Sequence, residues 1–257
     1  MYGSIGWLNR VYILMRYKVT VAYDGSNYHG WQTQRKGKSI EEAIEAVLKQ
    51  MHKYDVEIVG SGRTDSKVHA LGQVFHFDSN LNISEERMKI ALNTQLDKSI
   101  RIQKVEIVSD TFHARFDALE KRYDYYLTDN LNNPFIRNYM EVEYHSLDYN
   151  KMKEAAQYFL GTHDFTSFTS SKIDQRKDKI RTIKTFDIIQ ENDVTHFIIE
   201  GDGFLRYMVR MMVQTIIMVG KGKIEASEVK QMLDAKDKHI CRYKANACGL
   251  YLVAVKY

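Results

Sequence analysis

The side chains best suited to chemistry stand in one stretch, residues 60–74, where an acid, an arginine, hydroxyls and glycines lie between two apolar segments. Residues 56–59 are rich in β-branched side chains and residues 73–78 alternate apolar and polar, so both are expected to be strands. Asp65 would then lie on a connection held by a sheet, where catalytic groups are often placed. Asp65 is the first candidate for covalent or acid–base chemistry.

Two alternative interpretations of this stretch are open on local pattern alone. An Asp in a loop rich in Gly and Ser commonly forms a turn by bonding to its own backbone. His69, four residues after Asp65, could pair with it as in a hydrolase, although no nucleophile elbow accompanies them. The loop therefore needs a wider context.

Composition sets the class of protein. The chain has 257 residues, 44% of them hydrophobic, which is enough for one or two domains with a real core. A net charge of +4 leans weakly toward a polyanionic partner. Cys241 and Cys248 fit neither a disulfide framework nor a zinc site, which favours a reducing, cytoplasmic setting. The pairs His163/Asp164 and His76/Asp78 offer two ligands each, so no metal is expected.

Residues 1–14 are expected to be an N-terminal extension. They lack the basic start and the small-residue cleavage site of a signal peptide, and the first strand is expected to begin near Met15. The sequence contains no run of about 18 apolar residues. We therefore expect no membrane span.

Periodicity predicts two halves that are built alike, residues 15–118 and residues 119–257. In the first half we expect strands at 17–23, 56–59, 73–78 and 100–108, with helices at 39–51 and 84–96. In the second half we expect strands at 122–128, 140–144, 182–190, 194–200 and 249–255, with helices at 148–160, 204–219 and 226–236. Each half reads β-α-β-β-α-β, so the fold class is α+β, with two ferredoxin-like halves joined into one antiparallel sheet around a central groove.

One signature and six further landmarks in family order link the chain to a known family. Gly62-Arg63-Thr64-Asp65, followed by Val68-His69-Ala70, resembles the signature of the tRNA pseudouridine synthase A family. The other landmarks, in family order, are Asp24-Gly25 with Gly30-Trp31-Gln32 and the segments 112–116, 121–125, 161–168, 204–210 and 249–252. The resemblance covers nearly all of residues 15–257. Two departures stand out: Ser66-Lys67 replaces the usual Ala-Gly, and Asn246-Ala247-Cys248 stands where a Pro is usual.

The resemblance implies a fold, the pseudouridine synthase fold, and a set of roles. Asp65 would be the nucleophile, and Arg210 would pair with it across the groove. Arg63 would contact phosphate or fill the place of the extruded base. Tyr123 would stack on the flipped uracil, with its hydroxyl available for proton transfer. Phe204 and Leu250 would form the apolar wall of the pocket.

An independent argument supports Arg210. Arg210 is flanked by Met208, Val209, Met211 and Met212, and a lone arginine in such surroundings is expected to face inward and be paired. Its guanidinium is expected to lower the pKa of Asp65, which must be ionised to act. Tyr125, on the same strand face as Tyr123, is expected to be a core residue, as are Met211, Met212 and Met218.

The resemblance also implies a substrate and partners. The substrate would be tRNA, modified in the 3′ half of the anticodon stem-loop, with no cofactor and no metal. The enzyme would be a homodimer, and a basic run could clasp the tRNA; it consists of Lys172, Arg176, Lys177, Lys179 and Arg181. The alternative function is a non-catalytic RNA-binding protein with halves like RNA recognition motifs, whose aromatic signature is absent here.

Overall fold

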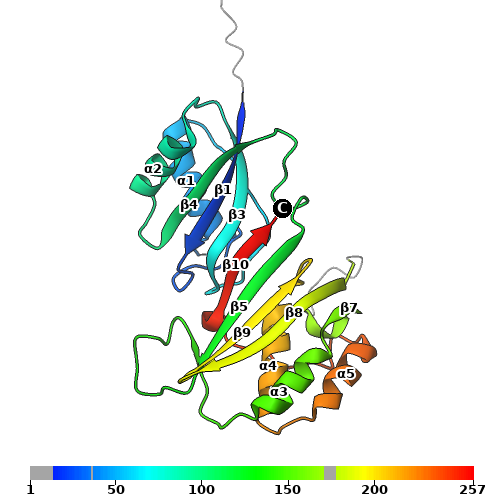
Figure 1. The fold of residues 1–257 in the computed structure, drawn as a ribbon. Coiled ribbons are helices and arrows are strands. Elements are labelled where there is room, and N and C mark those ends of the chain that lie inside the picture. The colour runs from blue at the N-terminus through cyan, green and yellow to red at the C-terminus, as the bar shows by residue number, and fades with distance from the viewer. Residues whose placement is uncertain (1–13, 36, 171–177) are drawn as a thin grey trace, which may run out of the picture.

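One continuous sheet runs through the protein and is flanked by helices. The computed structural model describes residues 14–35, 37–170 and 178–257. Its ten-stranded sheet has the order β4-β1-β3-β10-β5-β9-β8-β7, with β2 paired to β3 and β6 paired to β5. Helices α1 and α2 lie beside the strands of the first half, whereas α3, α4 and α5 gather beside those of the second (Figure 1). The described residues form no helix long and apolar enough to cross a membrane.

The first half follows the predicted order. It comprises β1 (Met15–Tyr23), α1 (Ile40–His52), β2 (Val59–Gly60), β3 (His69–Ser79), α2 (Glu85–Gln95) and β4 (Ile100–Val108). Ser39 caps α1 by accepting a hydrogen bond from the backbone N–H of Glu42, and Ile40, Ile44 and Leu48 bury one face of the helix. The strand order 4-1-3-2 is that of a ferredoxin-like unit.

The second half repeats this arrangement. It comprises β5 (Glu120–Thr128), β6 (Glu141–Val142), α3 (Tyr149–Gln157), β7 (Gly161–Asp164), β8 (Ile180–Glu191), β9 (Val194–Gly201), α4 (Met208–Gly220), α5 (Ala226–Ala235) and β10 (Leu250–Lys256), with 3₁₀ turns at Thr166–Phe168 and Ala247–Gly249. The order β10-β5-β9-β8 again reads 4-1-3-2. The α+β class and the two ferredoxin-like halves predicted from the sequence are confirmed.

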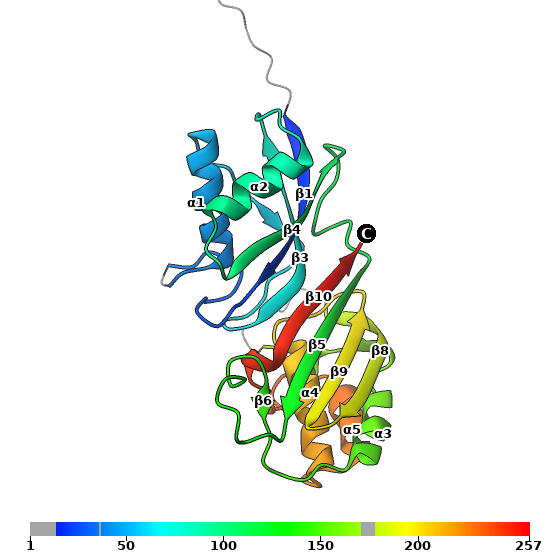
Figure 2. The ribbon, with the colours of Figure 1, turned by 60° about the vertical axis from the view of Figure 1, so that its left-hand side comes forward.

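The two halves join where β10 lies between β3 and β5. These two strands, β10 and β5, occupy the middle of the molecule in both ribbon views (Figure 1 and Figure 2). Strand β10 is antiparallel to β5 but parallel to β3, so the expected antiparallel sheet has a parallel step at this junction. In register, Leu252 is paired with Ala70 on one side and with Tyr123 on the other. Strand β10 therefore separates β5 from the start of β3, which directly follows the loop that carries Asp65.

Three local features differ from the sequence prediction. Strand β2 is only two residues long, and β3 begins at His69 rather than at Gln73. The edge strand β7 was not expected, because its four residues are too few to show a period.

Helix α4 is a core helix, as predicted. Met211 and Met212 are buried, and Met218 is partly buried against the core.

Candidate active site

The loop that carries Asp65 is fixed by buried polar side chains of the first half. The Ser61 hydroxyl donates to Gln73 Oε1 at 2.6 Å, and Gln73 Nε2 donates to the Gly62 carbonyl at 3.0 Å. The hydroxyls of Tyr23 and Thr64 are 2.8 Å apart. Buried groups satisfied in this way hold a single conformation, because any other would leave a polar atom unpaired. The loop is preorganised.

The second half also holds this loop. Lys121 Nζ, on β5, donates to the Ser61 carbonyl at 2.7 Å. Burial lowers the pKa of Lys121 to about 8, and the neighbouring charges of Arg115 and Arg181 act in the same direction. An added Cβ at Gly62 would lie 2.8 Å from Nζ, so a side chain there would displace this amine. Lys121 thus connects the two halves at the loop.

Asp65 and Arg210 form an ion pair between the halves. Arg210 Nη1 lies 3.3 Å from Asp65 Oδ2, and the two side chains are 11% and 21% exposed. The backbone of Ala245 holds the arginine twice: Arg210 Nε donates to the Ala245 carbonyl at 2.8 Å, and the Ala245 N–H donates to the Arg210 carbonyl at 3.0 Å. The guanidinium is therefore aimed at Asp65. The pairing predicted from the sequence is confirmed.

The net pKa of Asp65 differs from the sequence expectation. Burial raises the pKa of this carboxyl, and that effect exceeds the opposing effects of Arg210, Arg206 and Lys244. The expected lowering by a guanidinium is present, but the net direction is upward. The ionised form of Asp65 is consequently less stable, relative to its protonated form, than that of a surface aspartate. Perturbed pKa values of this kind are common at functional sites.

Tyr123 lies on β5 between the two halves. It is buried, and its ring meets that of half-buried Phe204 edge-to-face, with centroids 5.1 Å apart. Burial raises the pKa of the Tyr123 hydroxyl, and the charges of Tyr23 and Asp65 raise it further. Because Asp65 is among these charges, the hydroxyl is electrostatically coupled to the carboxylate, and it stays protonated at neutral pH.

Comparison with known proteins identifies the family. A family model described as tRNA pseudouridine synthase matches residues 19–117 and 155–257. The chain belongs to this family. It is 43% identical over 244 residues to "tRNA pseudouridine synthase A" of Exiguobacterium sp. (strain ATCC BAA-1283 / AT1b), covering 95% of this chain and 98% of the relative. It is 44% identical over 246 residues to the protein of the same name from Bacillus pumilus (strain SAFR-032), covering 95% and 99%. The resemblance stated from the motifs is confirmed.

The remaining residues that the family resemblance singled out are placed as follows. Leu250 is buried and pairs in register with Tyr125, itself fully buried as expected, whereas the register partner of Tyr123 is Leu252. Leu250 and Leu252 share one face of β10 because side chains alternate along a strand. Arg63 is exposed at the start of the Asp65 loop, where a ligand can reach it. The functional roles of these residues stay predictions.

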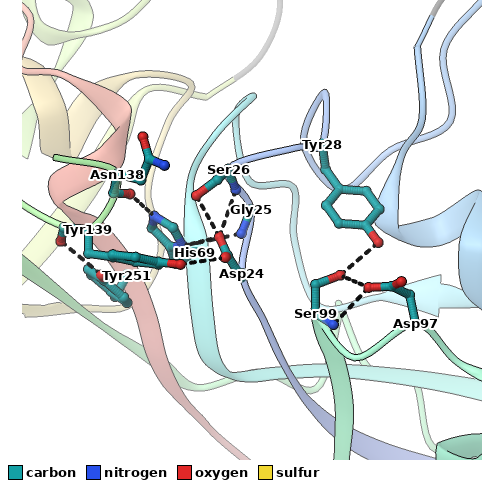
Figure 3. A network of polar contacts seen from close by, with 10 residues as sticks. All are labelled: Asp24, Gly25, Ser26, Tyr28, His69, Asp97, Ser99, Asn138, Tyr139 and Tyr251. Carbon is teal, nitrogen blue, oxygen red and sulfur yellow. Dashed lines mark hydrogen bonds and ion pairs between the residues drawn. The ribbon is translucent and has the colours of Figure 1, made fainter. Parts of the chain in front are cut away.

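His69, the residue considered for a hydrolase pair, has structural partners instead (Figure 3). Its Nδ1 accepts from the Gly25 N–H at 3.2 Å and lies 3.3 Å from Asp24 Oδ1, while Nε2 lies 2.9 Å from the Asn138 carbonyl. Its ring stacks on Tyr251, with centroids 4.7 Å apart. Burial lowers the pKa of this imidazole. His69 thus links the segment around Asn138 to the junction of β3 and β10. These contacts explain the position of His69 without a hydrolase role.

The two departures from the family pattern have distinct local structures. Lys67 takes a left-handed conformation, φ 65°, which glycine adopts without strain, and Ser66 Oγ donates to the Tyr28 carbonyl at 3.2 Å. Asn246 is bound by Glu141, whose oxygens accept from Asn246 Nδ2 at 2.8 Å and from the Asn246 N–H at 3.0 Å. A proline would have no N–H to donate at that position.

Two other features considered from the sequence are a metal site and the basic run. In the part of the chain that the structure describes, no cluster of three or more His, Cys, Asp or Glu side chains could hold a metal ion. Of the basic run considered for tRNA, Lys172, Arg176 and Lys177 lie outside the described residues. Arg181 Nη1 lies 3.9 Å from Asp178 Oδ2.

Sequence reasoning missed several residues of the site. Arg206 and Lys244 act on the charge of Asp65, and Lys121 and Ala245 hold its loop and its arginine. Arg206 and Lys121 fall inside the landmarks 204–210 and 121–125, but only contacts between distant segments show what they touch.

Proposed function

We propose that this protein is an isomerase that converts uridine to pseudouridine in tRNA, with Asp65 as its nucleophile. Membership of the family supports the reaction. The observation that carries the assignment of residues is the Asp65–Arg210 pair, 3.3 Å apart and assembled from both halves of the fold. An ionised carboxylate held in a partly buried, preorganised site is the group that such chemistry needs.

The reaction defines what the residues must do. Uridine and pseudouridine contain the same atoms, so the enzyme must break the glycosidic bond, retain and turn the base, and rejoin it through carbon. Asp65 could attack the base, attack the anomeric carbon or deprotonate the sugar, and each route begins with the ionised carboxylate. Arg210 orients that carboxylate and favours its charge. Tyr123 covers the extruded base, with Phe204 and Leu250 as the apolar wall, while Arg63 contacts the RNA. None of these steps calls for a cofactor.

The finer features of the substrate and assembly belong to the same proposal. The target uridines would lie in the 3′ half of the anticodon stem-loop, and the enzyme would act in the cytoplasm. It would be a homodimer, since one site of this size cannot hold both the anticodon arm and the elbow of a tRNA. Lys179 and Arg181, with the rest of the basic run, would supply contacts to the RNA backbone.

One assay tests the function. Unmodified tRNA is incubated with the protein in the presence of a chelator, and uridine isomerisation, which leaves the mass unchanged, is detected by chemical probing. Formation of pseudouridine confirms the proposal. Tight binding of tRNA without any isomerisation would indicate the RNA-binding module instead, and cleavage products would indicate a hydrolase.

Substitution of Tyr123 separates stacking from proton transfer. Tyr123→Ala should weaken substrate binding or turnover by the equivalent of about 1–3 kcal/mol, the usual value of one base–aromatic stack. Tyr123→Phe keeps the ring. If the protonated hydroxyl transfers a proton, this variant should bind tRNA normally and turn over slowly; if only stacking matters, it should stay active. Parental binding and parental turnover in the Ala variant would remove Tyr123 from the site.

Substitution of Asn246 tests the loop that fixes Arg210. Asn246→Ala removes the bond from Nδ2 to Glu141 and loosens the segment whose Ala245 carbonyl holds Arg210. We expect kcat to fall by up to about 10²-fold, the scale of a small misplacement of a catalytic group, with tRNA affinity nearly unchanged. Asn132→Ala, at an exposed loop position, is the matched control. A parental kcat in the Asn246 variant would contradict this positioning role.

A further inference from the structure

Three cationic side chains surround one tyrosine at the edge of the Asp65 site. The Arg206 and Arg210 guanidinium carbons lie 4.8 and 5.6 Å from the centre of the Tyr207 ring, and Lys244 Nζ lies 4.5 Å from it. Arg206 Nη2 also donates to the Tyr207 hydroxyl at 3.0 Å. Such cation–π contacts hold long, exposed side chains in place before any ligand arrives. Cationic side chains from two segments, residues 206–210 and residue 244, therefore contact the same ring.

The backbone of Tyr207 has an unusual conformation that makes this gathering possible. Tyr207 directly precedes α4 with φ 69°, in the left-handed region that a bulky residue rarely adopts. The preceding residue is fixed, because the Arg206 carbonyl accepts from Thr169 Oγ1 at 3.2 Å and from the Ser170 N–H at 3.1 Å. Strained residues that a structure retains tend to mark functional sites.

Among the residues that the structure describes, positive charge is in excess here. Arg210 is paired with Asp65, and Arg206 and Lys244 are exposed beside that already engaged carboxylate. Both nevertheless lie close enough to Asp65 to influence its ionisation. The N-terminus of α4 adds partial positive charge at the same place. The local field thus attracts an anion in addition to Asp65.

We propose that Arg206 and Lys244, held on the Tyr207 ring, bind one backbone phosphate of the RNA strand next to the target uridine. This inference rests on the proposed function, because it assigns the anion to the tRNA substrate. A phosphodiester fits better than a protein carboxylate: a guanidinium and an ammonium can together contact its two free oxygens, and a uridine held at Asp65 brings its flanking phosphates to the same place. Fixing that phosphate would hold the strand while the base turns.

Salt dependence of binding is the first test. Arg206→Gln and Lys244→Gln remove charge and keep most of each side-chain stem. The double variant should lower the slope of log affinity against log salt concentration by about 0.7, the contribution of one neutralised phosphate of a single strand, and each single variant should lower the slope by a smaller amount. The controls are Arg87→Gln and Lys153→Gln, exposed positions on α2 and α3 that should keep the parental slope. A parental slope in the double variant would overturn the proposal.

A neutral linkage in the RNA identifies the phosphate. tRNA carrying a single methylphosphonate immediately 5′ or 3′ of the target uridine is compared with unmodified tRNA. One of the two linkages should weaken binding by the parent several-fold and leave the affinity of the Arg206→Gln/Lys244→Gln variant unchanged. Equal losses in parent and variant, or no loss at either linkage, would exclude this phosphate site.

Tyr207→Asn tests the role of the ring. Asparagine tolerates the left-handed conformation, so this variant should keep the backbone fold and yet bind tRNA more weakly. Unchanged affinity would show that the ring does not organise the cations. All three tests measure binding, so they remain informative whether or not uridine is isomerised. A parent that makes pseudouridine while the double variant keeps the parental slope contradicts only the phosphate site.

Discussion

Replacing Asp65 by Asn is expected to abolish uridine isomerisation while the protein still folds and binds tRNA. The two side chains have nearly the same shape, but the amide is not a nucleophile. Removal of a catalytic nucleophile commonly lowers kcat on the order of 10⁴-fold or more. Single-turnover assays on unmodified tRNA measure the loss, and a parallel binding assay shows that the substrate still enters the site. Asp55→Asn, at an exposed position of the first half, is the control.

The same variant should change stability in a direction set by the pKa of Asp65. Burial raises that pKa in the folded protein, so ionising Asp65 at neutral pH costs folding free energy. This cost in folding free energy is fully present above the pKa of Asp65 in the folded protein. It disappears as the pH falls below the ordinary pKa of an aspartate. Asp65→Asn should therefore be slightly more stable than the parent near pH 7, and the gain should vanish in acid.

The turnover of the variant decides the catalytic prediction. Appreciable isomerisation by Asp65→Asn would show that Asp65 is not the nucleophile.

Much of the fold could be predicted because its signals are local. Ser39 and Ser84 mark the helix starts, and alternation marks the long strands, so the order of elements in both halves was recovered. The length of β2 and the existence of β7 could not be, because very short strands are defined by their partners and not by their own pattern. The parallel step between β3 and β10 joins residues far apart in the chain, and periodicity carries no information on it.

The site shows the same division. The Asp65–Arg210 pair could be inferred, because an arginine in an apolar helix segment needs a partner and the family pattern supplied one. The net pKa of Asp65 could not, since it depends on how far burial outweighs three cations drawn from separate segments. Nor does any sequence signal predict a left-handed Tyr207, since tyrosine does not favour that conformation. What the sequence leaves out are mainly quantities fixed by tertiary packing.

Arg210→Met is expected to lose activity and to shift its pH dependence. Breaking a buried ion pair on one side typically costs roughly 3–5 kcal/mol, and the 21% exposure of Asp65 places this pair toward the lower end. Arg210 is the largest influence that lowers the pKa of Asp65, so its removal raises that pKa further. The carboxylate then ionises only at higher pH. The acid limb of the kcat/KM profile should move to higher pH, and the loss of stability should be greatest above the new pKa and smaller in acid.

A double-mutant cycle tests whether this effect acts through Asp65. In an Asp65→Asn background no carboxylate is left unpaired, so Arg210→Met should cost much less stability there than in the parent, with a coupling of at least about 1 kcal/mol. Arg210→Lys adds a finer test, because lysine keeps the charge but lacks the fork that contacts Ala245 and Asp65 together. It should retain part of the stability and recover less of the activity. Equal costs of Arg210→Met in both backgrounds, together with an unshifted pH profile, would show that the pair does not control Asp65, and the charge on this carboxylate would then have to be governed by Arg206 and Lys244.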